Sequence, residues 1–239
     1  MKRHFAAALA TLMAFPALAA DKLPVQKAKS VGDLLDQGGL TMWCIFALSF
    51  LTLAMAAYYL MIFRKSEVLP DTFVTQAEEA ADKGDLGALR DLCAANPSPI
   101  AEIVGAAVEQ IEANPKANQA LIRSAAESVG GQHAEQMIHK IYLLTDVVAM
   151  GPMLGLLGTV IGTMDAFGST LGSDRGSQTL QLAEGVSKAL VNTAAGLVVA
   201  LVATMVFVFF RVKVNALTVD LERKSSRILT KLFVAKKLS

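Results

Sequence analysis

Charged residues, cysteine, histidine and tryptophan are all scarce in this chain of 239 residues. Only 18% of the residues are charged, against about 25% in an average soluble domain. A formal net charge of +1 excludes the broad basic surface that nucleic acid requires. Two cysteines are too few for a disulfide framework or a cysteine metal cluster. Without a GxxxxGK(S/T) or HExxH motif, no nucleophile–base pair, metal site or cofactor site is expected, and the chain is predicted not to be an enzyme.

Hydrophobic residues, in contrast, make up 54% of the chain, and the mean hydropathy is +0.47. Three long apolar runs, 40–63, 141–170 and 184–210, each reach the length of about 20 residues that a membrane-spanning helix needs. Because backbone groups in lipid must be hydrogen-bonded within the segment, these runs are expected to be helices. The sequence therefore predicts an all-α membrane protein with three transmembrane helices.

The first nineteen residues have the pattern of a secretory signal peptide. Lys2 and Arg3 precede a short apolar core, and Ala17-Leu18-Ala19 offers a small-residue cleavage site. An uncleaved N-terminal anchor is the alternative interpretation. Cleavage would leave the mature N-terminus in the periplasm of a Gram-negative cell.

Basic residues give the same orientation independently. Arg64 and Lys65 follow the first run, and eight lysines and arginines follow the third; such residues gather on the cytoplasmic side of a membrane. The predicted organisation is a signal peptide (1–19), a periplasmic segment (20–39), transmembrane helix one (40–63), a cytoplasmic helical domain (64–140), transmembrane helix two (141–170), a periplasmic loop (171–183), transmembrane helix three (184–210) and a cytoplasmic C-terminal helix (211–239).

The cytoplasmic parts carry opposite charge. Residues 64–140 hold seven basic and twelve acidic residues, whereas the tail 211–239 holds eight basic and two acidic ones on an amphipathic pattern. We expect the tail either to dock on the acidic helical region or to attract anionic lipid. Ser98 offers a cap for the helix after Pro97. Ala117–Lys140 is expected to continue into the second span as one helix, with a bend at Gly130-Gly131.

Glycines recur along one face of the second span. Gly151, Gly155, Gly158 and Gly162 are spaced by four, three and four residues, and small residues at this spacing let two helix backbones approach closely. Tight helix packing with no further role would explain these glycines completely.

Helix packing does not explain the hydroxyl groups beside the glycines. Thr159 and Thr163 lie one turn apart in the second span, and Thr193 lies in the third. We call these three residues the hydroxyl seam and expect them to line an ion path. Asn192 and Thr204 continue it on the third span. The alternative is that each threonine bonds only to the backbone of its own helix.

Charged residues lie beyond the hydroxyl seam. If Thr159 and Thr193 are level in antiparallel helices, Asp165 and Lys188 differ in height by about 1.5 Å, which predicts an ion pair between them. Glu184, one turn before Lys188, competes as the partner. Lys188 could instead extend toward the interface.

Two segments together resemble the MotA/TolQ/ExbB proton-channel family. They are Gly155-Leu-Leu-Gly-Thr-Val-Ile-Gly-Thr-Met164 and Ala189-Leu-Val-Asn-Thr-Ala-Ala-Gly-Leu197, and the stretch from Gly84-Asp85-Leu86 to Pro97-Ser98-Pro99 is also similar. The likeness covers roughly residues 35–220. Three spans fit the ExbB and TolQ branches, and the ExbB branch is the more similar. The chain departs from it at Lys188, where a glutamate is common, and at Asp165, where an asparagine is often found.

The resemblance implies a homopentamer in the bacterial inner membrane that encloses an ExbD-like single-span partner. Proton flow through such a complex would drive motion that a TonB-like protein carries to outer-membrane receptors. The family's two pore threonines correspond to Thr159 and Thr193, which would hydrogen-bond an aspartate of the partner. A TolQ-like subunit for envelope integrity and a membrane scaffold that conducts nothing remain the alternatives.

Overall fold

Every regular element that the structure describes is a helix, as the sequence predicts. The computed structural model describes residues 31–114, 117–170 and 175–236. The predicted signal peptide, most of the segment 20–39 and residues 171–174 of the predicted loop lie outside these described residues.

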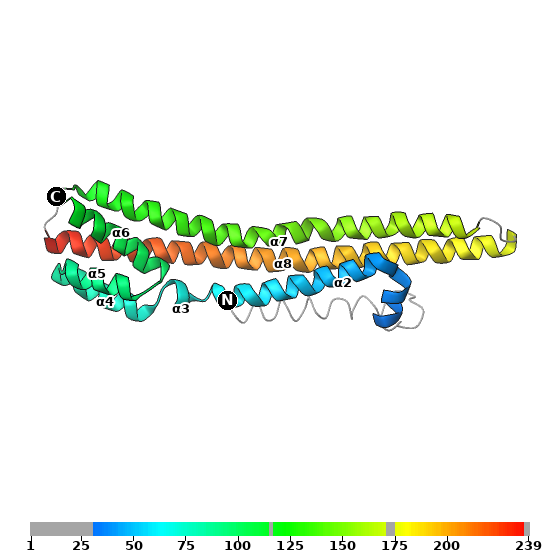
Figure 1. Ribbon diagram of the computed structural model, residues 1–239, viewed down its shortest axis with the longest axis horizontal. Helices are drawn as coiled ribbons and strands as arrows, with labels where there is room; N and C mark the ends of the chain where they lie inside the picture. The colour runs from blue at the N-terminus through cyan, green and yellow to red at the C-terminus, as the bar shows by residue number, and fades with distance from the viewer. Residues whose placement is uncertain (1–30, 115–116, 171–174, 237–239) are drawn as a thin grey trace.

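Two very long helices form the axis of the molecule. Helix α7 (Gln119–Thr170, 52 residues) and helix α8 (Arg175–Lys236, 62 residues) lie side by side over most of their length (Figure 1). At 1.5 Å per residue they are about 78 and about 93 Å long, more than twice the roughly 30 Å of a bilayer's hydrocarbon core. The expected continuation of residues 117–140 into the second span is confirmed. Helix α8 also runs without a break through residue 210, where the third span and the cytoplasmic C-terminal helix were expected to meet.

Helix α2 (Val31–Ile62) lies against α7 and α8 and changes direction at Gly39 (Figure 1). Gly39 has φ 62°, a backbone conformation that residues with a side chain rarely adopt, so the straight apolar part begins where the first run was expected. At the other end of this part, the Tyr59 hydroxyl donates to the backbone carbonyl of Lys140 at 2.6 Å. Within the described residues, α2, α7 and α8 are three helices long and apolar enough to cross a membrane.

Four shorter helices gather near the C-terminal end of α8 (Figure 1): α3 (Lys65–Val68), α4 (Asp71–Lys83), α5 (Leu86–Ala95) and α6 (Pro99–Ala113). We call α3–α6, with the parts of α7 and α8 that they cover, the head. The turn between α4 and α5 uses Gly84 at φ 68°, and the Asp85 carboxylate accepts the backbone N–H of Ala88 at 3.0 Å. Ser98 stands directly before α6, but the expected cap is wrong. Its buried hydroxyl has no hydrogen-bond partner.

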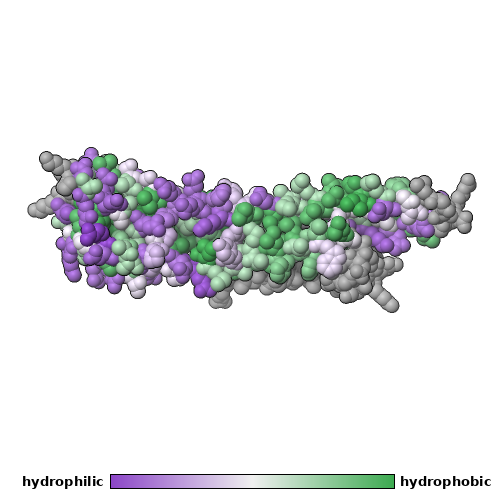
Figure 2. All heavy atoms as spheres, in the orientation of Figure 1, coloured by the Kyte–Doolittle hydropathy of each residue, from purple (hydrophilic) through white to green (hydrophobic). Residues whose placement is uncertain are grey.

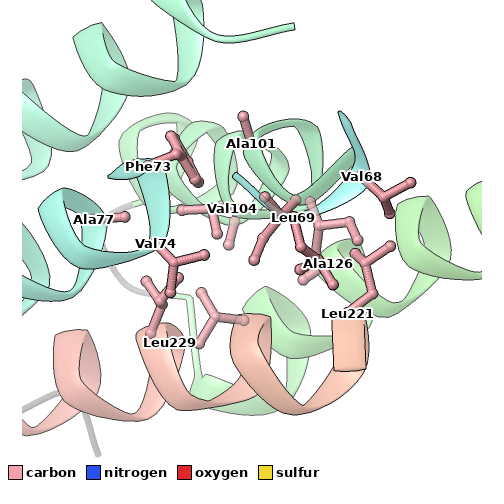
Figure 3. Packing of buried hydrophobic residues seen from close by; sticks show 14 of the residues in the cluster. Val68, Leu69, Phe73, Val74, Ala77, Ala101, Val104, Ala126, Leu221 and Leu229 are labelled. Carbon is pink, nitrogen blue, oxygen red and sulfur yellow. The ribbon is translucent and has the colours of Figure 1, made fainter. Parts of the chain in front are cut away.

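An apolar core holds the head together. Figure 3 shows Phe73 and Val74 of α4, Val104 of α6 and Leu229 of α8 converging in it, and all four are buried. Every apolar residue that made the tail's pattern amphipathic is buried against this core: Val214, Leu217, Leu221, Ile228 and Leu232. Burial of such side chains contributes roughly 1.5–3 kcal/mol each relative to exposure, so the tail of α8 is an integral part of the head.

A row of ion pairs joins α8 to α4 beside this core. We call it the charge ladder: Lys224 Nζ lies 3.0 Å from Asp71 Oδ1, Arg227 Nε 3.4 Å from Glu78 Oε1, and Lys231 Nζ 3.0 Å from Glu78 Oε2 and 2.8 Å from Asp82 Oδ2. The expectation that the basic tail docks on the acidic helical region is therefore confirmed within one chain. Three of the tail's basic residues point at α4, and lipid is not needed to balance them.

The Gly130-Gly131 pair does not interrupt α7, which remains helical through both residues. Instead, both glycines line a cavity of about 420 Å³ between α6, α7 and α8, whose walls include Ile103, Met137 and Leu229. A Cβ added at Gly131 would meet nothing within 4 Å. The missing side chains therefore leave space in the head.

The surface divides along the long axis. Figure 2 shows hydrophilic side chains concentrated over the head and hydrophobic ones over the stretch of α7 and α8 beyond it. Exposed large apolar residues on that stretch include Leu156, Val160, Leu197 and Leu201. Such a continuous apolar surface on two antiparallel helices is typical of a membrane-spanning region.

Candidate functional site

The glycine stripe of α7 meets α8 at backbone distance. A Cβ built on Gly151 would lie 2.9 Å from the carbonyl oxygen of Gly196, and one on Gly155 would lie 3.0 Å from the Cα of Thr193. Likewise, a Cβ on Gly162 would lie 2.9 Å from that of Ala189. Since real Cβ atoms essentially never approach other atoms under 3.0 Å, two of these positions admit only glycine without a shift of α8.

These contacts also define which residues of the two helices are level. Gly155 lies against Thr193, Gly158 against Asn192, and Ala166 against Gly185. Taken together, these contacts place Thr193 level with residues 155 to 158 of α7, which are about 1.5 to 6 Å closer to the head than Thr159. Thr193 is therefore somewhat closer to the head than Thr159 rather than level with it.

Lys188 pairs with another residue than the expected Asp165. Because Ala166 is level with Gly185, Asp165 is level with about Val186, and Lys188 lies about 3 Å closer to the head. In the structure the ammonium of Lys188 lies 2.9 Å from Glu184 Oε1, one turn away on the same helix. Glu184 was the competing partner in the sequence, and the single chain forms that pair.

Asp165, Glu184 and Lys188 line one polar hollow at the end of the site farther from the head. The hollow has a volume of about 760 Å³, and Thr41, Asn192 and apolar residues of α7 complete its walls. Asp165 is 25 residues along α7 from Lys140, roughly 37 Å, which exceeds the roughly 30 Å of hydrocarbon. By length, these charges therefore lie near the end of the apolar stretch that is farther from the head.

The hydroxyl groups of the seam are all used as hydrogen-bond donors to backbone carbonyls. Thr193 Oγ1 lies 2.9 Å from the carbonyl oxygen of Gly155, across the interface between α8 and α7. Thr159 Oγ1 lies 2.7 Å from the carbonyl of Leu156, and Thr163 Oγ1 lies 2.8 Å from that of Thr159, both on α7 itself. A carbonyl can only accept, so each hydroxyl donates its proton to the backbone. What the seam offers to any other group is oxygen lone pairs.

Sequence reasoning missed one polar contact beside the seam. Asn192 Nδ2 donates to Thr41 Oγ1 of α2 at 3.0 Å, between two residues that are 4% and 7% exposed. A buried amide in a membrane helix requires hydrogen-bond partners. Asn192 is the one amide side chain in the 22-residue uncharged stretch 189–210. Its need for a hydrogen-bond partner could be inferred from the sequence, but the identity of that partner could not.

The remaining chemistry of the described residues is sparse. No group of three or more His, Cys, Asp and Glu residues in the described ranges could hold a metal ion. Cys93 lies half-buried on α5, and burial raises the pKa of its thiol to about 11, which makes it a poor nucleophile near neutral pH.

Comparison with known proteins agrees with this architecture. A family model described as the MotA/TolQ/ExbB proton channel family matches residues 95–223, which include the glycine stripe and the hydroxyl seam. The chain is 30% identical over 180 residues to the biopolymer transport protein ExbB-like 1 of Synechocystis sp., covering 73% of this chain and 69% of that protein. It is 28% identical over 174 residues to the biopolymer transport protein exbB1 of Vibrio cholerae, covering 72% of this chain and 75% of that protein.

A third relative comes from the TolQ branch. The chain is 33% identical over 113 residues to the Tol-Pal system protein TolQ of Haemophilus influenzae, covering 46% of this chain and 49% of that protein. The chain belongs to the MotA/TolQ/ExbB proton channel family, and it is a multi-pass membrane protein. Proteins of this family are transport proteins and not enzymes.

Proposed function

We propose that this chain is the ExbB-like subunit of an ion-driven stator that energises transport across the outer membrane. In this proposal it lies in the bacterial inner membrane as a homopentamer. The ring surrounds an ExbD-like single-span partner, and a TonB-like protein transmits the motion. Two relatives that cover most of the chain carry biopolymer-transport names, and the proposed orientation rests on the basic residues at 64, 65 and in the tail.

The observation that carries the proposal is that the hydroxyl seam presents only acceptor oxygens. An acceptor-only surface binds a group that carries a proton or a positive charge, and it binds a carboxylate anion poorly. A protonated carboxylic acid on the partner helix can donate to Thr193 or Thr159, whereas the ionised acid cannot. The seam therefore stabilises the partner acid in its protonated, neutral state while that acid is inside the membrane.

This division of labour suits the residues of the chain. Along the helices, Lys188 is about 6 Å, and Asp165 and Glu184 are about 10 to 12 Å, from the level of Gly158 and Asn192 on the side away from the head. Thr193 lies close to that level, and Thr159 and Thr163 lie between it and Asp165. The three seam positions themselves hold no carboxylate, so in this proposal the partner supplies the titrating group and this chain supplies its hydroxyl environment.

Replacement of Thr193 by valine tests the proposal, because valine keeps the shape and removes the oxygen. The expected result is a loss of proton-dependent nutrient uptake of about tenfold, since one hydrogen bond to a proton-transferring group is worth roughly 1.4 kcal/mol. Thr52→Val is the control: Thr52 also lies in a predicted membrane span and also donates to a backbone carbonyl, that of Leu48 at 2.8 Å, but it is on α2 and outside the seam.

Membrane assembly of each variant is measured in parallel with uptake. Normal assembly with unchanged uptake in Thr193→Val contradicts the ion path and favours the scaffold. The choice between branches needs a deletion strain: loss of iron–siderophore uptake supports ExbB-like work, whereas detergent sensitivity supports the TolQ-like alternative, which the Haemophilus relative keeps open.

A further inference from the structure

Asn192 is an unusual residue for its place in α8. It is 4% exposed and occurs in a stretch of the helix that is otherwise apolar or small, in a part of the chain that spans the membrane. An amide in such surroundings is costly unless it is hydrogen-bonded. Its side-chain N–H donates to Thr41 Oγ1 at 3.0 Å, across 151 positions of sequence.

The backbone of α7 is shaped to receive this side chain. A Cβ added at Gly158 would lie 2.6 Å from the Cβ of Asn192 and 2.9 Å from its Nδ2. Any other residue at 158 would displace the amide from Thr41. The absence of a side chain at Gly158 therefore makes room for Asn192, whose amide lies between α7 and α2.

Two consecutive residues of α8 are thus tied to two different helices. Asn192 binds Thr41 of α2, while Thr193 donates to the carbonyl of Gly155 on α7 at 2.9 Å. Consecutive residues of a helix point about 100° apart around its axis. Two bonds in such different directions at one level restrict rotation of α8, and with it the position of the Thr193 oxygen.

The level of Asn192 and Thr41 is close to the end of the span that is farther from the head. Gly158 is 18 residues along α7 from Lys140, roughly 27 Å, and Thr41 follows Gly39, where α2 changes direction. Charged groups that face this level lie in the adjacent hollow: Asp165 from α7, and Glu184 and Lys188 from α8, while α2 contributes Thr41 and Cys44 there.

We propose that Asn192 is a positioning residue, which through its hydrogen bond to Thr41 holds α8 in the rotation that presents the Thr193 oxygen to the ion path. This inference rests on the proposed function, because it assigns the pair a role in proton-driven transport. It makes α2, which contributes nothing to the hydroxyl seam, part of the transport machinery.

The test compares Asn192→Ala and Thr41→Val with Thr41→Ser in cells that carry the complete complex. The first two variants remove the bond, whereas serine keeps the acceptor oxygen. We expect uptake to fall about three- to tenfold in Asn192→Ala and Thr41→Val, and to stay normal in Thr41→Ser. The double variant Asn192→Ala/Thr41→Val is expected to lose no more than the more severe single variant, because both remove the same bond.

The pH dependence of uptake separates positioning from mere stability. If the Thr193 oxygen stabilises the protonated form of a partner acid, displacing that oxygen lowers the acid's apparent pKa, and the pH midpoint of uptake moves down by about half a unit. Asn192→Ala, Thr41→Val and Thr193→Val are expected to move it in the same direction, and Thr52→Val is expected to leave it unchanged.

Three results distinguish the possibilities. Reduced uptake in Asn192→Ala and Thr41→Val with an unmoved pH midpoint and less assembled protein overturns positioning in favour of packing. A normal Thr41→Val variant also overturns it, and that variant is informative even where Asn192→Ala fails to assemble. If Thr193→Val itself has neither effect, the proposed function fails, whereas an effect of Thr193→Val alone removes only the present inference.

Discussion

Gly158 and Gly131 are both on α7, but the absence of a side chain has a different consequence at each position. At Gly158 a Cβ would lie 2.6 Å from the Cβ of Asn192, whereas at Gly131 it would meet nothing within 4 Å. Gly158→Ala is expected to destabilise the protein by about 1–3 kcal/mol, as overpacking does. Gly131→Ala is expected to stabilise it by up to about 1 kcal/mol through helix propensity. Thermal unfolding of the detergent-solubilised protein measures both, and equal shifts in the two variants would contradict the packing described for α7 and α8.

Single residues also mark the limit of prediction from sequence. The spacing of the four glycines predicts the face of α7 that meets α8, because a repeat of three and four residues follows the helix period. It does not predict the height at which the helices meet. A shift of one helix along the other by a few residues keeps the same faces in contact, but it changes the distance between Lys188 and Asp165. Thr41 was missed for the same reason, since its partner is 151 positions away.

At the scale of the elements, α8 and α4 offer a matched pair of charge reversals. Lys224 is 3.0 Å from Asp71, whereas no described acidic group lies within salt-bridge distance of the exposed Arg223. Lys224→Glu is expected to lower the melting temperature and make it salt-dependent, because it places like charges together. Arg223→Glu should change little. Equal loss in both variants, or in neither, would show that the charge ladder contributes nothing specific to docking of the tail.

The charge ladder contributes to stability over a defined pH range. The hydrogen bond from Lys224, followed by its charge, lowers the pKa of Asp71 from 3.8. That contribution is present above pH 3.8 and is lost as the pH falls through the lowered value. Hydrogen bonds to Asp82 and Glu78 raise the pKa of Lys231 from 10.5, so its contribution is lost only as the pH rises through the raised value. The difference between Lys224→Glu and wild type is therefore expected to stay constant from about pH 5 to 9.

The sequence predicts which segments make up the head, but it does not show that the tail and the third span form one continuous helix. The amphipathic pattern of the tail and its charge opposite to residues 64–140 were sufficient to predict docking on the acidic helices. The expected change from the third span to the cytoplasmic helix after residue 210 rests on hydropathy, which changes at Arg211; the chain stays helical there, because no proline or glycine stops α8. A change of solvent along a helix does not end it when apolar residues continue on one face.

For the whole molecule, the central untested feature is its orientation in the membrane. Alkaline phosphatase fused after Ala113 is expected to be inactive, because the head is cytoplasmic in the proposed orientation. The same enzyme fused after Thr170 is expected to be active. A fluorescent protein that folds only in the cytoplasm, fused at Ser239, is expected to fluoresce. Phosphatase activity after Ala113 together with inactivity after Thr170 would reverse the assignment and place the head outside.

The uninterrupted course of α8 has a mechanical consequence. From Asn192 to Lys231 the helix is one rod of 39 residues, about 58 Å long. Pivoting such a lever by about 5° at Asn192 carries Lys231 through roughly 5 Å, a displacement large enough to break or remake an ion pair with α4. A small tilt of α8 at Asn192 would thus become a displacement of several ångströms in the head, because the helix is uninterrupted between these two residues.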